Sequence, residues 1–103
     1  MAIRIGSYNF EGPYSNTSVL QDRAGLYAIL TLTGTGRYEV VDIGESATVK
    51  SRVESHDRQP CWQQNAKQGL YCAVLYTPHL QDVGRRNIEQ SLRDLYTPAC
   101  GVR

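Results

Sequence analysis

Two strand-forming segments joined by a glycine-rich turn constrain the fold of this chain most strongly. Residues 25–33 and 37–43 are rich in the β-branched, aromatic and aliphatic side chains that favour strands. Between them, Thr33-Gly34-Thr35-Gly36 supplies residues that readily adopt the positive φ angles of a tight turn. The sequence therefore predicts an antiparallel β-hairpin over residues 25–43.

A helix is predicted to follow this hairpin. Ser46 is a suitable N-cap, and Pro60 is expected to end the helix. One helical face would carry the positions that recur at i, i+3, i+4 and i+7, namely Val49, Arg52, Val53 and His56. A short second helix is expected from about residue 61 to residue 67.

The remaining segments predict one more strand and one more helix. Residues 70–76 form a nearly continuous apolar run, which is typical of a central strand buried on both faces. A last helix is expected from about residue 80 or 81 to residue 95, because Ile88, Leu92 and Leu95 recur with a helical period. Residues 1–24 are punctuated by glycine and proline and are expected to be irregular, with Tyr8 and Phe10 on a short edge strand.

Together these elements predict an α/β fold of the α+β type. We expect a small mixed sheet of about three strands in the order β-β-α-(α)-β-α, flanked by helices. At 103 residues the chain is short enough for one domain over residues 1–103. Residues 25–101 would be its core, and residues 1–24 an N-terminal extension.

Composition narrows the classes of protein to consider. Hydrophobic residues make up 41% and charged residues 20%, which is typical of a globular chain and excludes disorder. No apolar run approaches the length of about 18 residues that a membrane span needs, and the first residues lack a signal-peptide core. Three cysteines without a CxxC pair predict reduced thiols and a cytoplasmic location.

Net charge and metal-ligand spacing give weaker constraints. A net charge of +1 argues against tight DNA binding through bulk charge alone. The spacings of the two histidines and three cysteines match no structural zinc pattern.

Four residues in order along the chain suit phosphodiester hydrolysis. Glu89 is a helical carboxylate that could hold a hard divalent cation. Arg52 could neutralise the charge that develops on phosphate, and Tyr27 or His56 could handle the proton of the attacking water. Each residue alone also has a structural interpretation. Glu89 could pair with Arg85 or Arg93, four residues away on either side, while Arg52 and His56 could border the core.

At these positions the chain resembles the GIY-YIG nuclease family over residues 25 to 101. Gly25-Leu26-Tyr27 is similar to the first family motif, and Asp42-Ile43-Gly44 is similar to the second with its tyrosine replaced. Arg52 corresponds to the family's helix arginine, and His56 to a histidine found in some members. Glu89 corresponds to the metal-binding glutamate, and Pro98 to a C-terminal proline. Small stand-alone bacterial members are most similar, through Gly44-Glu45-Ser46 and His56-Asp57-Arg58 followed by Cys61-Trp62.

The resemblance implies a divalent-metal-dependent DNA endonuclease. Glu89 would hold Mg²⁺ or Mn²⁺, Arg52 would contact a phosphate oxygen, and Tyr27 or His56 would accept the proton of water. Asp42 and Gly44 would join Arg52 in contacting the substrate. The products would carry a 5′-phosphate and a 3′-hydroxyl. A domain this small is expected to find DNA through a protein partner or as a homodimer.

Two departures from the family pattern leave a second hypothesis open. Asp42 replaces a tyrosine, and Gly101 stands where the family has an asparagine. A degenerate domain that binds nucleic acid or protein without cutting would tolerate both changes. In either case Asp42 needs a partner, and we expect it to pair with Arg52 or to share the metal with Glu89.

Overall fold

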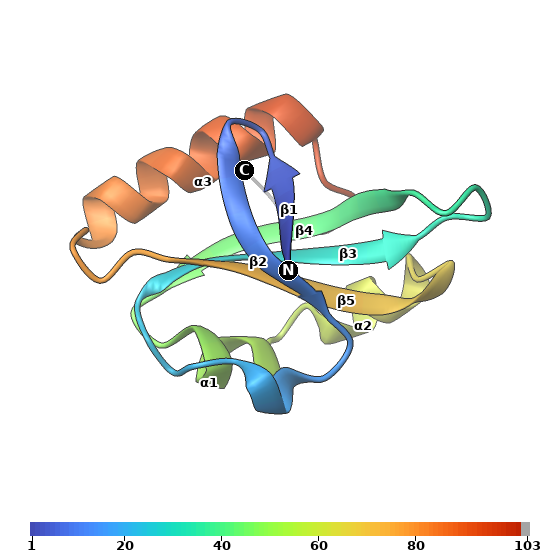
Figure 1. Ribbon diagram of the computed structural model, residues 1–103, viewed down its shortest axis with the longest axis horizontal. Helices are drawn as coiled ribbons and strands as arrows, with labels where there is room; N and C mark the ends of the chain where they lie inside the picture. The colour runs from blue at the N-terminus through green and yellow to red at the C-terminus, as the bar shows by residue number, and fades with distance from the viewer. Residues whose placement is uncertain (102–103) are drawn as a thin grey trace.

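The computed structural model describes residues 1–101, which form one antiparallel sheet with helices on both faces (Figure 1). The sheet has five strands in the spatial order β1-β2-β5-β3-β4. Along the chain the elements are β1 (Ala2–Ile5), β2 (Tyr8–Tyr14), the 3₁₀ turn η1 (Thr17–Val19), β3 (Gly25–Leu32), β4 (Tyr38–Ser46), α1 (Val49–Glu54), α2 (Gln59–Gln64), β5 (Gln68–Tyr76) and α3 (Asp82–Tyr96).

The α+β class agrees with the sequence-based expectation, but the expected mixed sheet of about three strands is wrong. All four strand pairs are antiparallel, and residues 2–14 add two strands where irregular chain was expected. Gly12-Pro13 is typical of a loop, yet both residues lie in β2 at a register shift between Glu11 and Tyr14. An irregularity of this kind tolerates a proline that has no N–H to donate.

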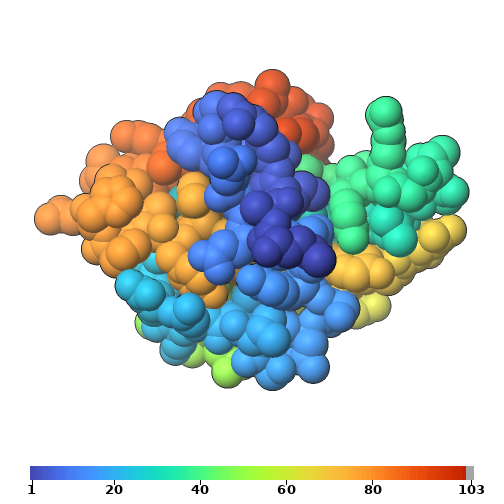
Figure 2. Space-filling view, in the orientation of Figure 1, coloured from blue at the N-terminus to red at the C-terminus, as the bar shows by residue number. Residues whose placement is uncertain are grey.

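The N-terminal hairpin is an integral part of the fold. Strand β2 lies between β1 and β5 and is therefore not an edge strand, and Phe10 is fully buried. Figure 2 shows the blue N-terminal residues at the front of the molecule, beside the orange and red residues of α3. The backbone N–H of Gly6, in the β1–β2 turn, donates a hydrogen bond to the Tyr96 hydroxyl at the end of α3 (2.7 Å).

The predicted β3–β4 hairpin and the central position of β5 are confirmed. Strand β3 pairs with β4 on one side and with β5 on the other. The register places Tyr27 opposite Gly44 and Ile29 opposite Asp42, so all four residues belong to one face of the sheet. A register shift after Ile29 leaves Val41 as the extra residue of β4.

The helical segment after β4 differs from the expectation. Thr48 and not Ser46 precedes α1, and the helix ends at Glu54, six residues before Pro60. Pro60 lies in the first turn of α2. Backbone N–H groups in a first turn make no intrahelical hydrogen bond, so a proline is tolerated there. His56 consequently lies in the turn between α1 and α2 and not on a helix face.

The core has one cluster on each face of the sheet. Tyr27 and Ile29 of β3 pack with Val49, Val53 and Trp62 from α1 and α2. On the other face, β3 contributes the alternate residues to a cluster with α3 and the N-terminal strands, formed by Ile5, Phe10, Leu26, Ala28, Leu30, Ile43, Ala73 and Leu92. Helix α3 was predicted at this position, but Leu95 of its expected apolar stripe is exposed.

The expectation of reduced thiols is wrong for two of the three cysteines. Cys61 of α2 and Cys100 form a disulfide that ties the segment after α3 to α2. The backbone N–H of Cys100 also donates to the carbonyl of Val41 (2.9 Å), which covers part of the outer edge of β4. Among the described residues, no helix is long and apolar enough to cross a membrane.

Candidate active site

Tyr27 and His56 form a buried pair at the centre of the candidate site. The Tyr27 hydroxyl lies 2.7 Å from Nε2 of His56, and the two side chains come from β3 and the α1–α2 turn. Only 1% of Tyr27 and 4% of His56 are exposed. Gly44 makes this arrangement possible, because a Cβ there would overlap the Cζ and hydroxyl oxygen of Tyr27.

The hydrogen bonds around His56 define how its ring is protonated. The backbone N–H of Arg58 donates to Nδ1 (3.0 Å), so this nitrogen must carry a lone pair. A neutral His56 then carries its proton on Nε2 and donates it to the Tyr27 oxygen. The Tyr27 O–H is left pointing elsewhere, and no described side chain or carbonyl accepts it. Tyr27 can therefore offer a hydrogen bond to an incoming anion.

Burial shifts the pKa values of both residues away from general-base chemistry at neutral pH. Burial lowers the pKa of His56 to about 4, and the charges of Arg52 and Arg58 act in the same direction. Burial raises the pKa of Tyr27 to about 12. At pH 7 the imidazole is neutral with both nitrogens engaged, and the phenol is protonated. The geometry thus favours Tyr27 as a hydrogen-bond donor and His56 as the residue that positions it.

Arg52 lies at the solvent-facing side of this pair. Its side chain is 42% exposed, and Nη2 contacts Oδ1 of Asp57 at 3.3 Å. The same Asp57 oxygen lies 3.2 Å from Nδ1 of His56. The expected Arg52–Asp42 pair is wrong, because Asp57 and not Asp42 is the partner of Arg52. A guanidinium held only by an exposed carboxylate remains available to a phosphate.

Glu89 lies on α3, whose apolar side packs on the sheet face opposite to Tyr27. Its side chain is 25% exposed, and its Oε2 accepts a hydrogen bond from Nε of Arg93 (3.3 Å), as the ion-pair alternative expected. Within the described residues, no group of three or more His, Cys, Asp or Glu side chains could hold a metal. A single partly exposed carboxylate fits Mg²⁺ or Mn²⁺ on condition that water and substrate phosphate supply the other ligands, which is the usual mode for Mg²⁺.

Asp42 is the centre of a buried polar network that sequence reasoning missed. The carboxylate is fully buried and accepts hydrogen bonds from Nε of Arg58 (2.8 Å), Nη2 of Arg93 (2.5 Å) and Nε1 of Trp62 (2.7 Å). Nη2 of Arg93 also donates to the carbonyl of Ile43. With its oxygens occupied, Asp42 cannot share a metal with Glu89, so this expectation is wrong too.

Gly101 has a structural reason in this network. A Cβ at Gly101 would lie within 3 Å of the guanidinium atoms of Arg93, and the residue has a φ of +94°. Arg93 donates from Nη1 to the adjacent Cys100 carbonyl (3.1 Å). Arg93 therefore occupies the space that a longer side chain at position 101 would need.

Charges from three elements converge on the Tyr27 hydroxyl. After burial, the pKa of Tyr27 responds to Arg52 and Arg58, which lower it, and to Asp42 and Glu89, which raise it. Of the predicted site residues, His56 and Gly44 lie directly against Tyr27, whereas Arg52 and Glu89 act on Tyr27 through their charges. Asp42 is an internal partner of arginines and is shielded from solvent.

The fold and the site together define an α+β domain with a buried Tyr–His pair flanked by an accessible arginine and a partly exposed carboxylate. Comparisons with family models, with curated proteins and with solved structures gave no match. The resemblance to GIY-YIG nucleases therefore rests on the sequence motifs alone.

Proposed function

We propose that this chain is a divalent-metal-dependent DNA endonuclease with a GIY-YIG-like site. The observation that carries the proposal is the 2.7 Å contact between Tyr27 and His56. The charges of Arg52 and Glu89 also act on the pKa of this tyrosine. Those four residues are distant in sequence and come from β3, the α1–α2 segment and α3. Their chemistry suits a phosphodiester better than any other common substrate.

The residues of the chain would divide the work as follows. Arg52 grips a non-bridging phosphate oxygen through its planar fork, for which it must exchange Asp57 for the substrate. Tyr27 donates its free O–H to the same phosphate, and His56 holds the phenol in place. Glu89 would hold Mg²⁺ or Mn²⁺, which when bound polarises the phosphate and stabilises the leaving oxygen.

Plasmid nicking by the purified chain in Mn²⁺ tests this function. Glu89→Gln keeps the shape of the side chain and removes its charge, so nicking should fall to background while the thermal midpoint changes little. Glu39→Gln is the matched control, because Glu39 is also ion-paired, to Nζ of Lys67 (3.0 Å), but lies on the exposed part of β4. Equal nicking by wild type and Glu89→Gln would overturn the proposal.

The burial of Tyr27 and His56 favours a second candidate, a binding module that cuts nothing. With 1% of Tyr27 and 4% of His56 exposed, a ligand would meet the Arg52 side chain first, which is 42% exposed. Under this alternative, wild-type chain retards a DNA fragment or captures a protein partner, yet leaves plasmid intact in both Mg²⁺ and Mn²⁺. Arg52→Glu should then abolish DNA retardation, while Glu89→Gln should leave it unchanged.

A further inference from the structure

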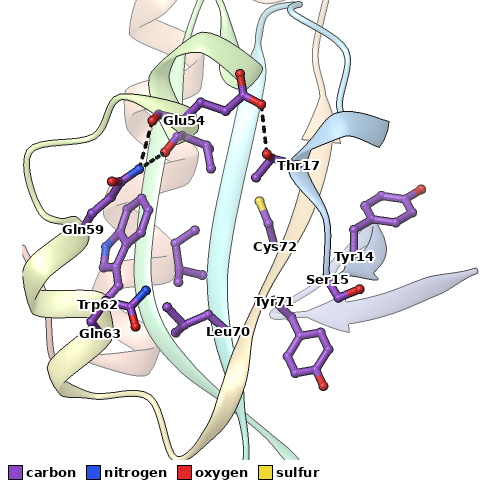
Figure 3. Close-up of a pocket in the computed structure, with 12 residues that line it drawn as sticks. Tyr14, Ser15, Thr17, Glu54, Gln59, Trp62, Gln63, Leu70, Tyr71 and Cys72 are labelled. Carbon is purple, nitrogen blue, oxygen red and sulfur yellow. Dashed lines mark hydrogen bonds between the residues drawn. The ribbon is translucent and has the colours of Figure 1, made fainter.

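A cavity of about 470 Å³ lies on the same sheet face as the candidate active site (Figure 3). Its floor includes the buried residues Ile29 and Cys72 together with Leu70, and Trp62 of α2 forms one wall. The exposed side chains of Glu54 and Gln63 also line it, and Oε2 of Glu54 accepts a hydrogen bond from the Thr17 hydroxyl (2.9 Å). The volume is within the range of about 300–1,000 Å³ that is usual for small-molecule sites.

The lining selects a neutral, flat ligand over an anionic one. None of the described residues that line the cavity is a lysine, arginine or histidine, and Glu54 contributes a carboxylate. The carboxylate repels a phosphate but accepts hydrogen bonds from an amino group carried on a flat ring. The Trp62 indole offers an aromatic surface for such a ring.

Shared residues connect the cavity with the candidate active site. Trp62 contacts His56 with ring centroids 4.7 Å apart and ring planes tilted by 46°, so the indole that lines the cavity also borders the candidate active site. Ile29 follows Tyr27 by two residues on the same face of β3, a distance of about 7 Å. Val53, which also lines the cavity, directly follows Arg52. A nucleotide at the phosphate site would therefore lie beside this cavity.

We propose that the cavity binds an amino-bearing nucleobase (adenine, cytosine or guanine) of the DNA held at the nuclease site. This inference rests on the proposed function, because DNA bound there is what brings a base to the cavity mouth. The exocyclic amino group of the base would donate to the Glu54 carboxylate, which can accept more than the one bond from Thr17, whereas thymine has no amino group. The base must leave its stack to enter, as in enzymes that act on extruded nucleotides.

Tryptophan fluorescence tests the proposal without metal and without cleavage. Trp62 is the only tryptophan of the chain, so quenching on addition of a nucleoside reports occupancy of the cavity. Deoxyadenosine or deoxycytidine should bind about tenfold or more tightly than thymidine, the ratio expected for one correctly paired base edge. Glu54→Gln should reduce this preference severalfold, and the distant Glu39→Gln should preserve it.

Protection of Cys72 provides an independent readout. The chain has three cysteines, two of which are joined in the disulfide, so Cys72 is the single free thiol. A nucleoside in the cavity should slow the reaction of the Cys72 thiol with methyl methanethiosulfonate. The decrease in rate should be proportional to the fraction of cavities that are occupied. Deoxyribose 5-phosphate, which has no base, should give neither quenching nor protection.

The outcomes separate this inference from the proposed function. Nicking without nucleoside binding would overturn the cavity assignment alone, and so would equal affinity for thymidine and deoxyadenosine. Protection by deoxyribose 5-phosphate alone would also overturn it. Selective nucleoside binding by a chain that never nicks DNA would support the cavity assignment and overturn the proposed nuclease function.

Discussion

At the scale of single residues, His56 couples stability to pH. Its pKa is about 4 in the folded chain and about 6.5 in an unfolded one, because burial disfavours the imidazolium. Between these values the unfolded chain binds the proton and the folded chain does not, so stability falls as pH falls. The full contribution is present above about pH 6.5, and about 3 kcal/mol of it should be lost on acidification to pH 4.

Urea denaturation of wild type and His56→Gln across this pH range measures the effect. The free energy of unfolding of wild type should decline more steeply than that of the variant, which has no imidazole at this position. Parallel pH profiles would show that burial does not lower the pKa of His56 in the folded chain.

The same scale shows how far the sequence determines the site. Tyr27, Arg52, His56 and Glu89 could be named from residue type and order, and two of them, Tyr27 and His56, are in direct contact in the structure. The partners of Asp42 could not be identified, because Arg58 and Arg93 are 16 and 51 residues away from it. Arg93 could be named from the sequence only as an ion-pair partner of Glu89, four residues before it. Its second partner, Asp42, is apparent only in the structure.

At the scale of elements, the β3–β4 hairpin depends on Gly44. Gly44→Ala should displace the Tyr27 ring, because the new Cβ would occupy its Cζ and hydroxyl positions. Such overpacking costs about 1–3 kcal/mol of stability, measurable by urea denaturation, and nicking should fall with it. Gly34→Ala is the control, because the nearest atom to a Cβ there is 3.9 Å away in the exposed hairpin turn. Equal stability of the two variants would show that Tyr27 does not rest on β4.

Elements with strong local patterns could be predicted, and those defined by context could not. The hairpin, β5 and α3 follow from strand-forming runs, turn glycines and helical periodicity. Pro60 misled the prediction, because proline suits the first turn of a new helix as well as the end of an old one. The expected short edge strand at Tyr8 and Phe10 proved to be the longer, internal β2, because its Gly12-Pro13 is a loop signal unless a neighbouring strand accommodates the irregularity.

At the scale of the whole molecule, the Cys61–Cys100 disulfide spans 39 residues of sequence. Closing a loop of this length in the unfolded chain is worth about 4 kcal/mol in the chain-entropy account. Reduction by a dithiol should lower the thermal midpoint of wild type and leave the Cys61→Ser/Cys100→Ser double variant unaffected. Calorimetry with and without reductant measures both. An unchanged wild-type midpoint would mean that the two thiols are not joined in solution.

The Asp42 network has a consequence for how the chain acquires its structure during synthesis. Asp42 leaves the ribosome 51 residues before Arg93, the arginine that it contacts inside the protein. Until α3 emerges, β4 carries an acidic group whose burial is compensated only in part, by Arg58 and Trp62. We therefore expect β4 to become fully buried only when α3 docks and Arg93 reaches Asp42. A chain that stops before α3 should leave this strand incompletely packed.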